Sequence, residues 1–403
     1  MIRDTSTDNN HTYRIFSLPY IFLYVWFIYR FQEGFYTLGG ISKILFGIQL
    51  AISLYYWVYA IFHYRFPIYM RALNILTIYL LSAGIIRYVN NETIRLTFEQ
   101  GGLPVERMSY LRQYINSLLP VFVFYVAAKK KIFTTKDIKV WIIPFVGLAT
   151  LQFIRYFIIH TAGTEYTEIT NNTGYVFVSL IPAILFLTEK PKLQLILLGY
   201  CMVMIMMSMK RGAIMIGIIL ICYCLYNMVK STKRGRIGIV FGVLVFLALS
   251  YWYVQEYMLS SDYFLRRLEQ TLNGNSSNRD YLYSTFWNHI QYRMNSWALL
   301  FGYGADGTVK LVGQFAHNDW LEIFIDLGFI GFVLYLFYWV SLFKTCFYLK
   351  KRNHLYFSVL TCFVIMYFIK SFMSMSINSM TIYATCVVGY VMAQIVPRQK
   401  ERK

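Results

Sequence analysis

The sequence predicts an all-α polytopic membrane protein, and three observations predict it. Of the 403 residues, 58% are hydrophobic and only 14% are charged, a composition that is not typical of soluble globular domains. Apolar stretches long enough to cross the hydrocarbon core of a bilayer recur along the whole chain. Lys and Arg gather in alternate loops between these stretches, as they do in helical membrane proteins. We expect about twelve transmembrane helices, which form a single domain over residues 1–403.

The expected transmembrane stretches follow one another with short loops between most of them. In chain order they are 15–31, 44–62, 72–89, 111–128, 138–160, 174–188, 192–209, 212–229, 236–254, 321–349, 355–374 and 377–396. The first is not followed by a small-residue cleavage site, so we expect it to be retained as a helix and not removed as a signal peptide.

The basic residues indicate how the helices are oriented. Short loops rich in Lys and Arg occur at 129–139, 190–192, 230–236 and 350–352, and the tail 398–403 is also basic. By the positive-inside rule these loops and both termini are cytoplasmic. The net charge of +19 therefore reflects membrane topology, and we do not expect nucleic acid as a partner.

The long segment 255–319 is expected outside the cytoplasm, as a partly helical cap over the membrane helices. Residues 262–272 are predicted helical, and 273–278 (NGNSSN) interrupt that helix. Residues 280–297 then form an amphipathic helix suited to lie on the membrane surface. Its apolar positions recur every four residues, at Leu282, Phe286, Ile290 and Met294.

Several cations are expected on the outer side, where the positive-inside rule disfavours them. Lys210 and Arg211 occupy a tight turn between two apolar stretches, Arg155 lies near the outer end of another, and Arg279 follows the 276–278 turn. We expect them to converge on an outward-facing cavity. Such a cavity suits an anionic lipid headgroup, above all a lipid-linked phosphate or pyrophosphate, because arginine binds phosphate oxygens in a bidentate manner.

Each of these cations also has a purely structural interpretation, which the sequence leaves open. The pair 210–211 can extend its charges to lipid headgroups. Arg155 can form an intramembrane ion pair with Glu165 or Glu168. Arg279 can be a solvated loop charge.

His317 stands in a short polar run just before the stretch 321–349. A neutral imidazole can accept a proton from a hydroxyl group, so His317 is a candidate general base. Asn318, Glu322 and Asp326 are spaced at four-residue intervals, and they form one polar stripe along the following helix. This stripe is expected to orient His317 or to line the path of an acceptor. Hydrogen bonds between helices are the alternative.

Three motifs in order resemble the superfamily of O-antigen ligases and O-antigen polymerases. Residues 208–212 (SMKRG) resemble its Ser-Arg-Gly turn, with Lys210 inserted. Residues 278–280 (NRD), Trp287 and 300–304 (LFGYG) resemble its Gly-Arg, Trp and Gly-x-Gly region, with Asn in place of the first Gly. Residues 316–331 (AHNDWLEIFIDLGFIG) look like its His-Asn-x-x-Leu-Glu segment, with Asp326 where Glu is commoner.

The resemblance implies glycosyl transfer outside the cytoplasm, from an oligosaccharide linked to undecaprenyl pyrophosphate. An acceptor hydroxyl attacks the anomeric carbon with inversion, and the lipid pyrophosphate leaves. By this analogy His317 activates the acceptor, while Arg211 and Arg279 hold the pyrophosphate. The remaining polar residues named above are expected to bind pyrophosphate or acceptor, and they are Lys210, Arg155, Asn318, Glu322 and Asp326. Neither a metal nor another cofactor is expected.

The sequence therefore predicts a polymerase of polysaccharide repeat units for O-antigen, capsule or exopolysaccharide, in the bacterial inner membrane. One alternative is a ligase that transfers the finished chain to lipid A-core, and another is a flippase for the same lipid-linked units. A non-enzymatic membrane scaffold is a further possibility, for which substitution of His317 should be silent. Expected partners are membrane lipid, the lipid-linked oligosaccharide, and a chain-length regulator and a flippase of the same pathway.

Overall fold

The computed structural model describes residues 16–35, 39–96, 103–161, 172–231 and 279–395, with a few isolated positions between 232 and 278. The described chain is almost entirely helical. The helices are α2 (Leu18–Phe35), α3 (Gly39–His63), α4 (Ile68–Val89), α5 (Ser109–Lys129), α6 (Thr135–Thr161), α7 (Gly174–Ile184), α8 (Pro191–Met207), α9 (Arg211–Ser231), α12 (Arg279–Tyr292), α13 (Ser296–Phe301), α14 (Gly307–Val312), α15 (Asp319–Lys350), α16 (His354–Met373) and α17 (Ile382–Ala393). A 3-10 turn, η3 (Ile377–Ser379), precedes α17, and β1 (Ile94–Leu96) pairs antiparallel with β2 (Leu103–Val105).

The all-α polytopic membrane architecture is confirmed. Within the described ranges, six helices have the length and apolar composition needed to cross a bilayer, and shorter apolar helices accompany them. Every expected stretch except 236–254 coincides with a helix, and 236–254 lies outside the described residues. Two expected stretches are shorter as helices than predicted, because α7 ends at Ile184 and α17 begins only at Ile382. The total of twelve spans stays a prediction.

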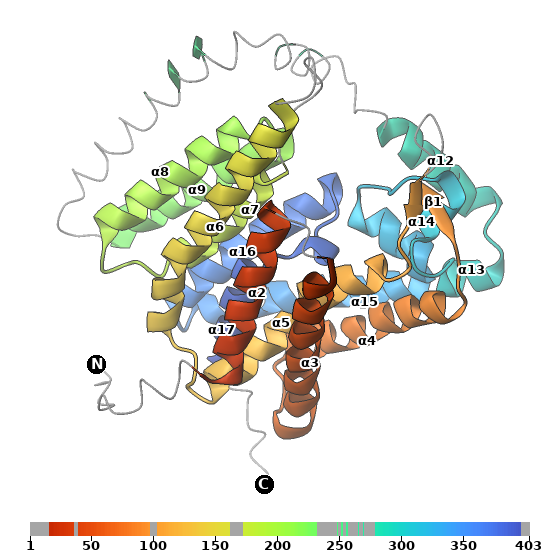
Figure 1. Ribbon diagram of the computed structural model, residues 1–403, viewed down its shortest axis with the longest axis horizontal. Coiled ribbons are helices and arrows are strands. Elements are labelled where there is room, and N and C mark those ends of the chain that lie inside the picture. Colours follow the sequence, from red (N-terminus) through yellow and green to blue (C-terminus); the bar gives the residue numbers. More distant parts are fainter. Residues whose placement is uncertain are drawn as a thin grey trace.

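Helix α5 lies at the centre of the bundle, in contact with α3, α4 and α17 (Figure 1). Residues 117–128 are all buried, which fits a stretch that is apolar on every side. Gly389 in α17 permits the closest approach, because a Cβ there would overlap the Val121 carbonyl and the Phe124 side chain. This close approach holds α17 against α5, and Ser117 Oγ of α5 donates to the Asn378 carbonyl in the turn before α17.

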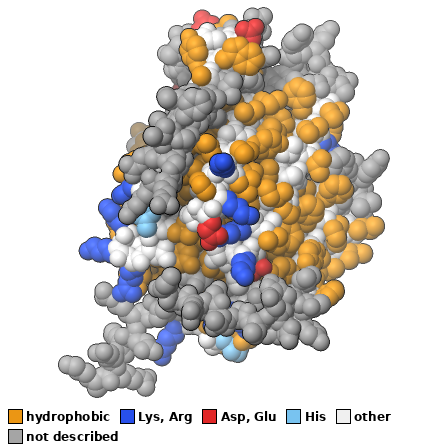
Figure 2. Space-filling view, turned by 90° about the vertical axis from the view of Figure 1, so that its left-hand side faces the viewer, with side chains coloured by type: hydrophobic (Ala, Val, Ile, Leu, Met, Phe, Trp, Pro, Cys, Tyr) orange, Lys and Arg blue, Asp and Glu red, His pale blue; other side chains and the backbone are white. Residues whose placement is uncertain are grey.

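The outer surface of the bundle is apolar, as lipid contact requires. Figure 2 shows hydrophobic side chains over much of one face of the molecule. Large exposed aliphatic residues occur on several helices, among them Ile44, Ile143, Ile196 and Ile218. In water such a surface would favour aggregation, whereas in a bilayer it faces lipid tails.

Helices α12, α13 and α14 and strand β1 gather on one side of the molecule, opposite α8 and α9 (Figure 1). The three helices belong to the predicted cap 255–319, whereas β1 comes from the segment after α4. Apart from isolated positions, the expected helix 262–272 and the interruption 273–278 lie outside the described residues. The amphipathic helix is present as α12, but it ends at Tyr292, before the expected 297. Its apolar residues Leu282 and Phe286 pack against Ala316 and Ile325. The expected contact with the membrane surface is therefore wrong for these two side chains, which instead join the cap to α15.

The chain that leaves α13 packs against a kink in α15. Gly328 has non-helical backbone angles (φ 66°, ψ −164°), and a Cβ there would overlap the backbone of Leu300 and Gly302. Only glycine adopts this conformation readily. The interruption leaves carbonyls of α15 available to other donors, and the N–H of Tyr303 donates to Ile325 O at 2.9 Å. The kink thus makes a docking place for the loop between α13 and α14.

Candidate functional site

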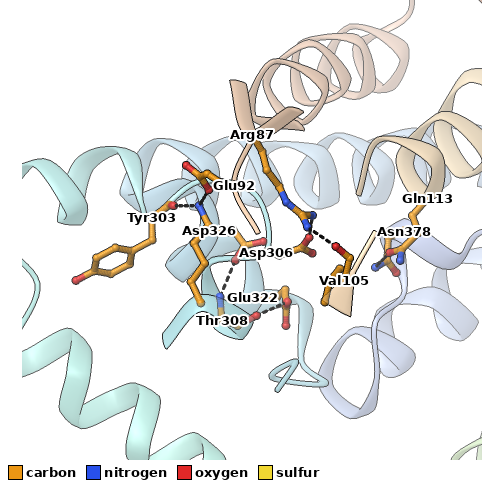
Figure 3. Close-up of polar contacts among 11 residues, drawn as sticks. Arg87, Glu92, Val105, Gln113, Tyr303, Asp306, Thr308, Glu322, Asp326 and Asn378 are labelled. Carbon is orange, nitrogen blue, oxygen red and sulfur yellow. Dashed lines mark hydrogen bonds and ion pairs between the residues drawn. The ribbon is translucent and has the colours of Figure 1, made fainter. Parts of the chain in front are cut away.

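Helix ends that are far apart in the sequence enclose a cavity of about 850 Å³. It is lined by residues near the C-termini of α2, α6 and α16 and near the N-termini of α5, α7, α12 and α17. The turn between α8 and α9 and the segment before α15 complete the wall. Asn378 of η3 donates to Gln113 Oε1 of α5 at 2.9 Å, which ties two sides of the wall together (Figure 3).

The cavity wall carries strong positive charge. Its cationic residues are Arg30, Arg112, Lys210, Arg279 and Lys370, and His317 also lines it. Among the described residues no Asp or Glu lines the cavity. Arg112 also pairs with the exposed Glu106 at 2.6 Å. Because fixed cations that share one cavity repel one another, an anion bound there is stabilised by all of them.

The backbone around His317 directs its side chain into the cavity. His317 has φ 52°, a left-handed conformation that is unfavourable for residues other than glycine, and such strain is common at functional sites. Hydrogen bonds on both sides hold it. The N–H of Ala316 donates to Glu322 Oε2 at 2.8 Å, and the Asn318 side chain caps α15 by accepting from Trp320 N at 2.9 Å.

The surroundings of His317 favour its neutral form. Burial lowers the pKa of the imidazole, and the positive charges of Arg279 and Lys210 lower it further. A neutral imidazole can accept a proton, whereas a histidine held as a cation cannot. His317 therefore has the protonation state that a general base requires near neutral pH.

Lys210 reaches the cavity from a tight turn between α8 and α9. Met209 before it has φ 52°, and the N–H of Lys210 donates to the buried Ser208 Oγ at 3.3 Å. Gly174 at the start of α7 packs against Ser208 so closely that a Cβ would overlap it. The turn is thereby fixed, and Lys210 lines the cavity, whereas its neighbour Arg211 begins α9 and is not among the lining residues.

Arg279 enters as the first residue of α12, the helix whose apolar face packs on α15. It acts electrostatically on His317 and also on Tyr175 of α7. The Tyr175 hydroxyl in turn lies against Gly212 of α9. His317, Lys210 and Arg279 are thus brought together as the sequence predicts, with Tyr175 among them as an additional lining residue.

Arg155 lies in α6 and is not among the residues that line the cavity. Gln152, about one helical turn earlier, lines it instead and donates to Arg30 O at 3.4 Å. The expected partners Glu165 and Glu168 fall in 162–171, outside the described residues, so that pairing stays a prediction.

The polar stripe of α15 holds the cap, and its members are not among the lining residues (Figure 3). Glu322 accepts from Thr308 Oγ1 at 2.6 Å, and Asp326 accepts from Thr308 N at 3.2 Å. Both carboxylates are buried. The stripe therefore pairs with the short helix α14 through Thr308, and Glu322 also accepts from Ala316 N before α15. Its contact with the site is indirect, through Ala316 and the turn at His317.

A second polar junction fastens the cap to α4, and sequence reasoning did not find it. The buried Arg87 forms an ion pair with Asp306 and donates to Val105 O of β2 at 3.4 Å (Figure 3). Lys310 of α14 pairs with Glu92 at 2.5 Å. Removing one partner of a buried pair destabilises a protein by about 3–5 kcal/mol, because the other charge stays buried. This junction keeps α14 beside the start of α15.

The segment 374–381, which forms part of the cavity wall, is anchored by Asp319. This buried carboxylate accepts from Tyr335 Oη at 2.9 Å, from Ser376 N at 2.9 Å and from Ile377 N at 3.1 Å.

Of the lining cations, Arg30, Arg112 and Lys370 were not predicted. Lys370 carried the clearest signal, since an ionisable residue within an apolar helix is a functional candidate.

Residues 195–336 match the family model described as O-antigen ligase. Over this segment the chain is similar to the O-antigen ligase and polymerase superfamily. The matched segment of this O-antigen ligase-like membrane enzyme includes Lys210, Arg279 and His317, and it ends within α15, before Lys370. Searches of curated proteins and of solved structures found no match.

Proposed function

We propose that this chain polymerises oligosaccharide repeat units carried on undecaprenyl pyrophosphate into O-antigen, capsular or exopolysaccharide. The observation that carries the proposal is the cavity in which a neutral His317 stands beside Lys210 and Arg279. A base next to fixed cations suits transfer of a sugar from a diphosphate leaving group. The superfamily match supports the same class of reaction.

In the proposed reaction the hydroxyl oxygen of the acceptor sugar attacks the anomeric carbon of the donor. A new C–O bond forms on one face, the bond to the pyrophosphate oxygen breaks on the other, and the configuration inverts. The hydroxyl proton passes to the imidazole of His317, and the bonding electron pair stays with the pyrophosphate. Lys210 and Arg279 stabilise that growing negative charge, with Arg211 adding to the positive field of the turn, so the proposed reaction needs no metal ion.

The active site is proposed to face away from the cytoplasm of the bacterial inner membrane. The basic loops at 129–131 and 190–192 follow the ends of α5 and α7 that lie far from the cavity-lining residues of these helices. The loop at 350–352 follows the C-terminus of α15, whose N-terminus adjoins the cavity-lining His317. The positive-inside rule then assigns those loops, and with them both termini, to the cytoplasm. A chain-length regulator and a flippase for the donor are the proposed pathway partners.

A ligase reaction is the second candidate, because the matching family model is described as O-antigen ligase. Both reactions use the same donor and the same leaving group. They differ in the acceptor, which is another lipid-linked unit for a polymerase and lipid A-core for a ligase.

Purified protein supplied only with lipid-linked repeat units tests the proposal and separates the two reactions. A ladder of lengthened lipid-linked glycans on gels is the result expected for a polymerase. Product that appears only when lipid A-core is added would assign the ligase reaction. His317→Ala and Arg279→Ala are expected to abolish the ladder, and Arg211→Ala is expected to weaken it. Lys139→Ala, on a partly exposed surface pair with Glu189, is the matched control. Full activity in all three site variants would overturn the proposed site.

A further inference from the structure

Lys370 is a buried cation that the proposed mechanism does not use. It lies near the C-terminus of α16, its side chain is only 4% exposed, and it lines the cavity. Within the described part of the chain it makes one hydrogen bond, donating to Ser379 Oγ at 2.6 Å, and no carboxylate forms an ion pair with it. An ammonium group has three donors, so this single hydrogen bond leaves two of them without an acceptor among the described residues.

The carboxylate that acts electrostatically on Lys370 is Asp319, but Asp319 is already engaged. It accepts hydrogen bonds from Tyr335, Ser376 and Ile377, which hold the 374–381 segment. Asp319 therefore has a structural role that its neighbours satisfy. A buried cation without a carboxylate partner is expensive within a membrane protein, and it is tolerated where a ligand supplies the counter-charge.

Lys370 lies near the other cations of the predicted pyrophosphate site. Its ammonium lies 4.8 Å from the centre of the Tyr175 ring, and Tyr175 also interacts with Arg279. Lys210 acts on Lys370 by charge repulsion, so the two ammonium groups lie within electrostatic reach. Arg279 and Lys370 thus both interact with Tyr175, and Lys210 lines the same cavity, although the three cations come from distant parts of the chain.

We propose that Lys370 is a third cationic ligand of the lipid-linked diphosphate, together with Lys210 and Arg279. The identity of this anion rests on the proposed function. A diphosphate carries more than one negative charge and gains a further one as the sugar leaves, so three fixed cations match it better than two. Lys370 lies beyond the family-matched segment 195–336 and belongs to none of the motifs that it contains.

Binding of farnesyl pyrophosphate, a short prenyl diphosphate, to the purified full-length protein in detergent tests this inference. Lys370→Gln removes the charge and keeps a donor for Ser379. Loss of one charge-assisted contact is expected to raise the Kd about tenfold. Lys370→Arg, which keeps the charge, is expected to bind more tightly than Lys370→Gln. Lys139→Gln is the matched lysine control, and its Kd should equal that of the wild type.

Ser379→Ala separates ligand binding from a structural role for Lys370. It removes the hydrogen bond to the 374–381 segment and keeps the ammonium, so it should weaken binding less than Lys370→Gln does. Equal losses in the two variants would show that Lys370 merely positions the wall and would overturn the inference. If Lys370→Gln does not give a monodisperse protein, Lys370→Met serves as the charge-free variant.

Arg279→Ala distinguishes failure of this inference from failure of the proposed function. Weak binding in Arg279→Ala with normal binding in Lys370→Gln would reject Lys370 as a ligand and leave the proposed donor site in place. Normal binding in both variants would reject the diphosphate site itself, and the inference with it.

Discussion

The cavity and the junction between α4 and the cap use the same kinds of residue in opposite ways. At the junction, Arg87 meets Asp306 and Lys310 meets Glu92, so each cation has a carboxylate partner. In the cavity, Lys210, Arg279 and Lys370 face a wall without an Asp or Glu among the described residues. The comparison teaches that charge pairing distinguishes the two roles. Paired charges hold the cap in place, whereas the positive charges of the cavity wall lie where an anionic ligand can bind.

The largest effect is expected in the cavity. His317→Ala should reduce kcat/KM for chain elongation by a factor of about 10²–10⁴, the usual contribution of a general base. The apparent Tm in detergent should stay close to that of the wild type, because the described hydrogen bonds in this turn are made by Ala316 and Asn318. A loss of activity explained entirely by a lower Tm would contradict this division between the two regions.

A large effect on stability is expected at the junction. Arg87→Met leaves the buried Asp306 without its partner, so it should lower stability by about 3–5 kcal/mol. The double variant Arg87→Met/Asp306→Leu removes both charges and should recover most of that loss. Thermal unfolding in detergent measures the stability of the single and the double variant. Arg279→Gln, in the cavity, is the comparison, and its Tm should equal that of the wild type. A double variant no more stable than Arg87→Met would show that the pair has another role.

The pH dependence of the reaction should reveal the cations around His317. Burial, Arg279 and Lys210 all lower its pKa, so the imidazole stays neutral to lower pH than an isolated histidine. Activity should fall only when the pH drops below this lowered value and the imidazole is protonated. Lys210→Gln removes one repelling charge, which raises the pKa of His317 and moves the acidic limb of the kcat/KM profile to higher pH.

The position of that acidic limb is measured on normalised profiles, so that a lower maximal rate in Lys210→Gln does not matter. Lys139→Gln, which alters a lysine outside the cavity, should leave the limb where it is in the wild type. An unmoved limb in Lys210→Gln would mean that the titrating group is not His317, or that Lys210 does not act on it.

The features that depend on neighbouring residues could be predicted from the sequence, and those that depend on packing could not. Each helix could be predicted from its own stretch of sequence, because an apolar segment in the membrane must form its backbone hydrogen bonds within itself. His317 stood out because it is polar beside such a stretch. Lys370 and Arg30 reach the cavity only because helices far apart in the sequence end there together. The partners of Glu322 were equally hidden, since the kink at Gly328 determines which loop docks on α15.

The smallest effect is expected at Asn318, where the two interpretations of the polar stripe make opposite predictions. As the cap of α15, Asn318 accepts from Trp320 N and Leu321 N, and Asn318→Ala should lower stability by about 1 kcal/mol. Asn318→Ser restores a capping oxygen and should return Tm and activity to near the wild-type values. As a pyrophosphate or acceptor ligand, Asn318 would instead donate through its amide, which serine cannot replace. Activity that stays low in Asn318→Ser while Tm recovers would therefore assign Asn318 to the substrate and extend the binding surface from the cavity onto α15.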